Sequence, residues 1–171
     1  MGSHIKYGIN VPNFGSAYYN PETLSELASD TEEACWDGFF VWDHIILDRK
    51  WNVPFVDPWV ALATIAIRTK RIRIGTLVIP LARRRPWKLA RETVSIDHIS
   101  NGRLVLGVGL GVPRDFEAFG EEANNRIRAE KMDEALDILT GLWTGKPFSY
   151  SGKHYQLEEV TFLPKPVQAP R

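Results

Sequence analysis

The sequence predicts an α/β fold with about four parallel strands and covering helices. Short apolar or β-branched runs alternate four times with longer segments whose apolar residues recur at helical spacing. Three of those longer segments open on a proline, which is favoured at the first position of a helix. Strands that alternate with helices in this way form parallel sheets, because each helix connects one strand to the next.

The first unit is a strand over residues 5–12, which Pro12 ends, followed by a helix that opens at Asn20 and Pro21. Gly38 stands where a C-terminal cap of this helix is expected. The single cysteine falls on the inner face of the helix, so we place it in the core. The small and apolar residues at helical spacing are Leu24, Leu27, Ala28, Thr31, Ala34 and Cys35.

The second unit begins with a short apolar run over 39–42, which predicts a buried strand. Asp57 then caps a helix over 58–69. The third unit starts with a β-branched strand over 72–78, bounded by Pro80.

The third helix is expected over 86–99 and ends at the Asn-Gly pair 101–102. A fourth strand over 104–108 and an amphipathic helix over 126–143 complete the repeat. Residues 148–162 then predict a small hairpin or extended excursion. Prolines keep the last stretch out of a helix or a central strand. They are Pro164, Pro166 and Pro170.

Composition excludes several classes of protein. The chain has 171 residues, 44% of them hydrophobic, and its 21 basic and 21 acidic side chains give a formal net charge of zero. This balance provides no general attraction to nucleic acid or to a membrane surface, and no apolar run is long enough to span a bilayer. One cysteine excludes an internal disulfide and favours a reducing compartment. We therefore expect a cytoplasmic protein. Residues 1–4 look like a remnant of an expression vector, and residues 5–171 form one domain whose extended tail begins near residue 145.

Function in a parallel α/β sheet gathers at the carboxyl ends of the strands. This rule alone nominates Asn10 after the first strand, Asp43 and His44 after the second, and the segments 77–80 and 107–111. His44 is the best chemical candidate, since an imidazole acts near neutral pH as a base, an acid or a hydrogen-bond donor, and an adjacent carboxylate can tune it. The alternative is a histidine that only caps a strand end by hydrogen bonding. Neighbouring residues on a strand face opposite sides, so spacing alone does not bring Asp43 to His44.

Two other motifs have simpler explanations. GVGLG at 107–111 lacks the last glycine of the dinucleotide fingerprint, whose place Val112 takes. We attribute its glycines to tight strand packing or to the close approach of a flat ligand. Arg83-Arg84-Arg85 could bind an anion near a helix N-terminus, but a solvated loop is the more common role of such a run. Neither His98 nor His154 has a partner at metal-ligand spacing, no zinc or iron site is visible, and no serine or cysteine stands in a nucleophile motif.

Six stretches of the chain resemble the amino-terminal half of the luciferase-like monooxygenases, a superfamily of flavin- and F420-dependent oxidoreductases built on a (β/α)8 barrel. Their order and spacing match over essentially the whole chain. The stretches are GFFVWDH (38–44), DPWVALATIAIRTKRIRIGTLVIPLARRRPWKLARET (57–93), IDHISNGRLVLGVGLG (96–111), DFEAFGE (115–121), RAEKMDEALDILTGLWTGKPFSYSGKHY (128–155) and PKPVQAPR (164–171).

The resemblance implies a site at the top of a barrel for FMN, or alternatively for the deazaflavin F420, with a small organic molecule as substrate. His44 would be the base or hydrogen-bond partner near the ring, and Asp43 would orient it. Leu77-Val78 matches the bulge of the third strand that often carries a non-proline cis peptide bond supporting the ring. The other residues that we assign to the cofactor are Asn10, Gly107, Gly109 and Leu110.

Two departures from the family affect this expectation. Leu110 stands where bacterial luciferase has a phosphate-binding arginine and one F420 enzyme has a catalytic glutamate. The chain also stops before a fifth strand, whereas a complete barrel takes about 250 residues, or about 200 at least. We therefore expect half of a (β/α)8 TIM-type barrel, whose first and fourth strands are open edges that favour self-association into a homo-oligomer. The alternative function is a non-catalytic half-barrel module that self-associates or binds a partner.

Overall fold

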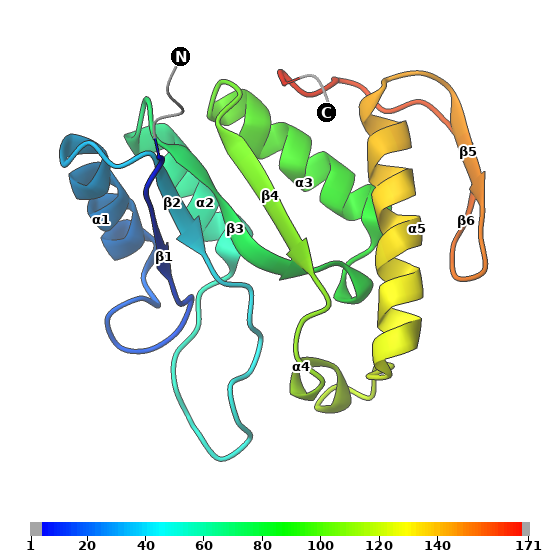
Figure 1. Cartoon of the computed structure of the whole chain (residues 1–171), viewed down its shortest axis with the longest axis horizontal. Helices are drawn as coiled ribbons and strands as arrows, with labels where there is room; N and C mark the ends of the chain where they lie inside the picture. Colours follow the sequence, from blue (N-terminus) through cyan, green and yellow to red (C-terminus); the bar gives the residue numbers. More distant parts are fainter. Residues whose placement is uncertain (1–4, 169–171) are drawn as a thin grey trace.

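Figure 1 shows a four-stranded sheet and the helices that connect its strands. The computed structural model describes residues 5–168. The proposed vector remnant, residues 1–4, and Pro170 lie outside the described residues. The strands of the sheet are β1 (Gly8–Val11), β2 (Gly38–Val41), β3 (Arg73–Pro80) and β4 (Leu104–Gly109), and the long helices are α1 (Pro21–Glu33), α2 (Pro58–Arg68), α3 (Pro86–Ile99) and α5 (Asn125–Trp143).

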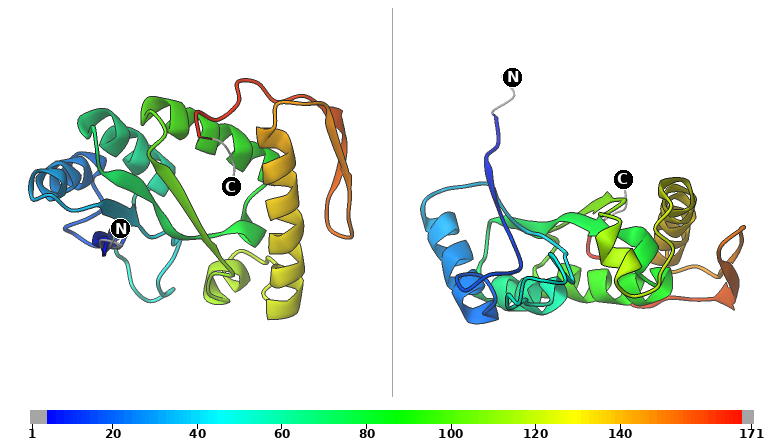
Figure 2. Two further views of the ribbon diagram at one scale, coloured as in Figure 1. Left: turned by 45° about the horizontal axis from the view of Figure 1, so that its top comes forward. Right: turned by 90° about the horizontal axis from the view of Figure 1, so that it is seen from below.

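The strands lie side by side in chain order, β1-β2-β3-β4, and every neighbouring pair is parallel. Helices α1, α2 and α3 cover one face of the curved sheet, and no helix of the described residues covers the other face (Figures 1 and 2). Helix α5 packs against α3 beyond the edge strand β4. The predicted α/β class, with four parallel strands and covering helices, is confirmed. No helix within residues 5–168 has the length and apolar character needed to cross a membrane.

The helices begin where the local sequence predicts, because the chain supplies a capping acceptor. The side chain of Asn20 accepts a hydrogen bond from the Glu22 amide at 2.8 Å, and Asp57 accepts one from the Trp59 amide at 2.8 Å. Helix α5 starts one residue earlier than expected, since Asn124 caps it in the same way.

Two expectations about the end of α1 are wrong. The helix ends at Glu33, and Cys35 then adopts a left-handed conformation with a φ of 62°. This turn carries the Cys35 side chain outward, so the cysteine is exposed and is not a core residue. The chain no longer needs Gly38 as a cap, and this glycine is the first residue of β2.

Short elements at the carboxyl end of the sheet were not predicted. They are the 3-10 turn η1 (Leu81–Arg83) and the one-turn helix α4 (Arg114–Glu117). Neither is long enough to show hydrophobic periodicity in the sequence. The expected hairpin is present as the antiparallel pair β5 (Phe148–Ser151) and β6 (Gln156–Val160).

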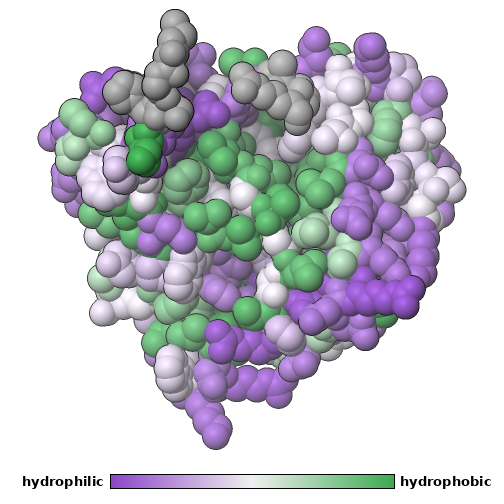
Figure 3. Space-filling view, in the orientation of Figure 1, coloured by the Kyte–Doolittle hydropathy of each residue, from purple (hydrophilic) through white to green (hydrophobic). Residues whose placement is uncertain are grey.

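The two faces of the sheet differ in burial. The core lies between the sheet and the helices, where Phe39, Ile74 and Leu62 have no exposed surface. On the open side, Leu77 is 47% exposed and Val78 is 38% exposed. Figure 3 shows an apolar band across this face, so the sheet presents hydrophobic surface on a side that no helix of residues 5–168 covers.

Candidate active site

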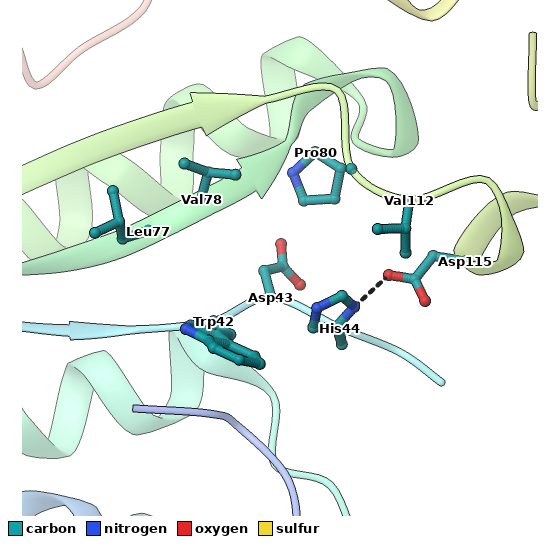
Figure 4. Close-up of a pocket in the computed structure, with 9 residues that line it drawn as sticks. Trp42, Asp43, His44, Leu77, Val78, Pro80, Val112 and Asp115 are labelled. Atoms are coloured by element: carbon teal, nitrogen blue, oxygen red, sulfur yellow. Dashed lines mark hydrogen bonds and ion pairs between the residues drawn. The ribbon is translucent and has the colours of Figure 1, made fainter. Parts of the chain in front are cut away.

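A pocket of about 290 Å³ lies where β2, β3 and β4 end (Figure 4). Two of these strands feed directly into the unpredicted short elements, since η1 follows β3 and α4 comes soon after β4. The carboxyl ends of the strands therefore hold the pocket, as the topology predicts. Its lining residues are Trp42, Asp43, His44, Leu77, Val78, Pro80, Gly111, Val112 and Asp115.

His44 is held by a carboxylate from a different part of the chain. Its Nδ1 atom lies 2.8 Å from Oδ2 of Asp115, in helix α4 (Figure 4). The Asp115 side chain is almost fully buried, whereas the imidazole is 19% exposed toward the pocket. A histidine whose one ring nitrogen is fixed and whose ring still reaches a pocket can exchange a proton with a ligand.

The backbone of His44 is fixed as firmly as its ring. The His44 amide donates to Oδ1 of Asn13 at 3.1 Å, and the Asn13 side-chain amide donates to the His44 carbonyl at 2.9 Å. Asn13 is fully buried, and it also donates to the carbonyl of Val56 at 2.9 Å. It therefore joins the end of β2 to the loop after β1 and the loop before α2.

Asp43 has different partners from those that the resemblance implied. Its carboxylate accepts hydrogen bonds from Arg83 at 2.6 Å and from Arg84 at 2.7 Å. The Asp43 side chain is 1% exposed, and the hydrogen bond to the His44 ring comes from Asp115 instead. The expected orientation of His44 by its neighbour is thus replaced by orientation from Asp115, because successive residues of an extended chain point to opposite sides.

Arg83 joins the two carboxylates into one network. One terminal nitrogen of its guanidinium lies 3.2 Å from Asp115 Oδ2, and the other lies 2.6 Å from Asp43 Oδ1. Its side chain is only 3% exposed. A solvated loop and a free anion site are therefore both wrong for Arg83 and Arg84, since buried carboxylates already neutralise their charge.

Aromatic side chains form one wall beside the histidine. The rings of Trp42 and Phe14 lie edge-on to the imidazole, with centroids 5.8 and 6.1 Å away. Phe55 packs on Phe14 at 5.2 Å. Trp42 also lines the pocket, so this aromatic wall lies partly on the side of His44 that faces the pocket.

The third strand carries the irregularity that the resemblance implied. The peptide bond between Leu77 and Val78 is cis, and the pairing of β3 with β4 shifts register between Thr76 and Ile79. Strand β4 approaches this bulge closely, because a Cβ atom on Gly109 would lie 2.7 Å from a methyl group of Val78. Tight strand packing, one of the two explanations offered for the glycines, therefore applies.

The other residues assigned to the cofactor lie near the pocket without lining it. The Asn10 side chain reaches the Leu77 carbonyl at 3.5 Å. Gly107 and Gly109 lie in β4 against the β3 bulge, and the carbonyl of Leu110 accepts a hydrogen bond from the buried Arg128 at 2.8 Å. The structure thus brings Asp43, His44, Leu77 and Val78 together at the pocket.

Asn13 and Asp115, which fix His44, were not predicted from the sequence. Asp115 opens the stretch DFEAFGE that carries part of the family resemblance, and this is the one signal that could have marked it. Its role depends on a contact that spans 71 positions of the chain.

The pocket fits the ring of a flavin or deazaflavin better than its phosphate. Leu77 and Val78 offer an exposed apolar surface, and Oδ1 of Asp115 is a buried acceptor with no partner among residues 5–168. An unpaired buried acceptor at a pocket can be completed by a donor of a ligand or by ordered water. Arg83 and Arg84, which bond to the pocket residue Asp43, are already paired with its carboxylate.

The fold and the site together define a parallel α/β scaffold of four strands, with a histidine at the carboxyl ends of the strands. The sequence pattern of the luciferase-like monooxygenases matches residues 5–171, and the chain belongs to this family.

Individual relatives agree with this assignment. The F420-dependent glucose-6-phosphate dehydrogenase of Amycolatopsis mediterranei is 31% identical over 160 residues, which are 88% of this chain and 46% of that protein. The monooxygenase RslO1 from Streptomyces bottropensis superposes with a TM-score of 0.82 at 28% identity, over 96% of this chain and 50% of that one. An F420-dependent secondary alcohol dehydrogenase shares the fold, with a TM-score of 0.83 at 23% identity over 94% of this chain and 49% of its own. The chain spans about half the length of the relatives it matches.

Proposed function

We propose that this chain carries the ring-binding, histidine-bearing part of a flavin- or F420-dependent oxidoreductase that acts on a small organic substrate. The observation that carries the proposal is His44, fixed by Asp115 at 2.8 Å and exposed to an apolar pocket at the carboxyl ends of the strands. A histidine with a purely structural role would have no need of an open pocket beside it.

FMN and F420 both stay candidate cofactors, since the relatives include F420-dependent enzymes and a monooxygenase in complex with FMN. Proteins about 30% identical to this chain are F420-dependent glucose-6-phosphate dehydrogenases, while RslO1 is a monooxygenase. Leu77 and Val78 would support the ring, and Asn10 and the glycines of β4 would lie near its edge. When bound, such a cofactor accepts or donates a hydride.

In this proposal, His44 exchanges a proton and neighbouring aromatic residues shield its ring. The imidazole of His44 would take a proton from the substrate or hold it by a hydrogen bond. Trp42 and Phe14 exclude water from one side of that ring, which strengthens electrostatic interactions in the pocket. The buried cluster of Asp43, Asp115, Arg83 and Arg84 would keep the strand ends in place, and its two carboxylates balance its two guanidinium groups.

Titration of the 171-residue chain with F420 and, separately, with FMN tests the proposal through the change in cofactor fluorescence. Saturable binding is expected for at least one of the two. His44→Ala should lower the rate of cofactor-dependent turnover with the fold retained. His98→Ala is the matched control, because this exposed histidine lies in α3 and contacts the carbonyl of Lys165. Absence of binding by both cofactors, or equal rates for both variants, would overturn the proposal.

A non-catalytic module that self-associates is the second candidate function. It is favoured by the apolar open face of the sheet and by the free edges of β1 and β4, each of which has one neighbour in the sheet. Zero formal net charge means that two copies would not repel each other. Light scattering at micromolar concentration should then give a dimer or a larger species, and a monomer would contradict self-association. The cytoplasm stays the predicted location.

A further inference from the structure

The hydrogen bond between His44 and Asp115 has a defined direction. A carboxylate oxygen can only accept, and Oδ2 of Asp115 already accepts from the Arg83 guanidinium, which always carries its protons. The 2.8 Å contact therefore requires a proton on Nδ1 of His44. In a neutral imidazole the other nitrogen, Nε2, then has a free electron pair.

Nε2 of His44 is the nitrogen left for a ligand. It lies on the side of the ring away from Asp115 (Figure 4). Within residues 5–168 it makes no hydrogen bond, while Nδ1 is occupied. A ligand in the pocket would therefore meet an acceptor on this ring.

Arg83 determines where Asp115 can lie. Its two terminal nitrogens span Asp115 Oδ2 at 3.2 Å and Asp43 Oδ1 at 2.6 Å, and it also donates to the Asp43 carbonyl at 2.8 Å. Asp43 is the residue directly before His44, so one guanidinium ties the histidine's own strand end to the carboxylate that holds its ring. The planar fork of an arginine can bridge two such sites, whereas the single ammonium of a lysine is a point charge.

We infer that Asp115 and Arg83 are positioning residues that select one tautomer of His44. Asp115 holds the Nδ1 proton, Arg83 fixes Asp115, and together they leave Nε2 unprotonated and directed away from Asp115 into the pocket. This inference rests on the proposed function, because it makes His44 a proton acceptor toward the substrate. The tautomer itself is a property of the chain without a cofactor, so it can be tested even if no cofactor binds.

Long-range ¹H–¹⁵N correlation spectra of the ¹⁵N-labelled, 171-residue chain at pH 8 distinguish the two tautomers. The His44 signals are those lost in His44→Gln, and circular dichroism checks that each variant is folded. In the wild-type protein the Nδ1–H form should exceed the Nε2–H form by about tenfold or more, the preference expected of a hydrogen bond to a charged group. A major Nε2–H form, or a ring protonated on both nitrogens, in the wild-type protein would by itself overturn the inference.

Three variants test the two positioning residues. Asp115→Ala should make the Nε2–H form the major one, because the acceptor for Nδ1–H is lost. Asp115→Asn, which keeps an oxygen for Arg83 and His44 and is the less disruptive change, should retain the Nδ1–H form. Arg83→Lys should lower the Nδ1–H to Nε2–H ratio by roughly three- to tenfold through loss of the bridge.

Arg84→Lys is the matched control for Arg83→Lys. Arg84 bonds to the same Asp43 carboxylate at 2.7 Å but has no contact with Asp115. The ratio of the Nδ1–H to the Nε2–H form of His44 in Arg84→Lys should equal that of the wild-type protein. An Nδ1–H form that persists in folded Asp115→Ala, or equal ratios in the two lysine variants, would refute the roles assigned to Asp115 and Arg83.

Discussion

Replacing Asp43 with asparagine tests whether the buried charge network stabilises the carboxyl end of the sheet. The side chains of Asp43 and Arg83 are 1% and 3% exposed, and two guanidinium groups lie within 2.7 Å of the carboxylate. Removing one partner of a buried ion pair costs about 3–5 kcal/mol. When the Asp43 charge is lost, Arg84, which is 21% exposed, can turn to water, and Arg83 keeps its ion pair with Asp115. The lower end of the range of destabilisation therefore applies.

We therefore expect Asp43→Asn to lower the free energy of unfolding by about 3 kcal/mol, or the melting temperature by about 6–12 °C. Urea unfolding at one fixed protein concentration measures the change, since self-association would make stability depend on concentration. Asp57→Asn is the matched control, because asparagine caps a helix as well as aspartate does, and its effect should stay within about 0.5 kcal/mol. A loss below about 1 kcal/mol for Asp43→Asn would refute the role assigned to the network.

Three further changes probe other parts of the molecule. Hydrogen bonds, the strongest from Lys153 and the next from His154, lower the pKa of Glu130 from 4.5 to about 2. The ionised Glu130 carboxylate therefore stabilises the fold fully above about pH 4.5, and this stabilisation is lost as the pH falls toward 2. The melting temperature should fall less between pH 5 and pH 3 in Glu130→Gln than in the exposed control Glu158→Gln, and equal falls would contradict the contact. Gly107→Ala places a methyl group against the Thr76 carbonyl, which should cost about 1–3 kcal/mol in a thermal melt, whereas an unchanged melt would mean that β4 can move away. Cys35 is exposed, so a thiol reagent should label it in the native protein, and labelling only after denaturation would place it in the core.

Local signals explain how much of the fold could be predicted from the sequence. Asn20 and Asp57 act on amides two or three residues away, so the starts of α1 and α2 are readable without any tertiary contact. The end of α1 was misread because Cys35, a residue that rarely adopts positive φ, makes the turn instead of Gly38. The sequence offers no mark of that choice.

The site was predicted only where topology determines it. The rule about strand ends found Asp43, His44 and the segment at Leu77, because it needs nothing beyond the order of strands and helices. The partner of His44 lies 71 positions away, and the partners of Asp43 lie 40 and 41 positions away. Such pairings depend on how two loops pack against each other, and adjacency in sequence suggested the wrong carboxylate for the histidine.

Buried polar side chains have different hydrogen-bond partners at the two ends of the sheet. At the amino end, Arg103 donates to the carbonyls of Ala66, Thr69, Ile72 and Ser100, and Asp97 accepts from two backbone amides of the tail. These bonds tie one backbone segment to another, which is a structural role.

At the carboxyl end, the side chains of Asp43, Arg83, Arg84, Asp115 and His44 bond mainly to one another, and several of their atoms have no partner within residues 5–168. These atoms are Nε of Arg83, Nε of Arg84 and Oδ1 of Asp115. Unpaired buried polar atoms are costly, so a fold tolerates them chiefly where a ligand or ordered water completes the bonding. Their concentration around His44, and the backbone pairing of Arg103 and Asp97 at the other end, favour the carboxyl ends of the strands as the place where a ligand or ordered water completes the bonding, an argument independent of family likeness.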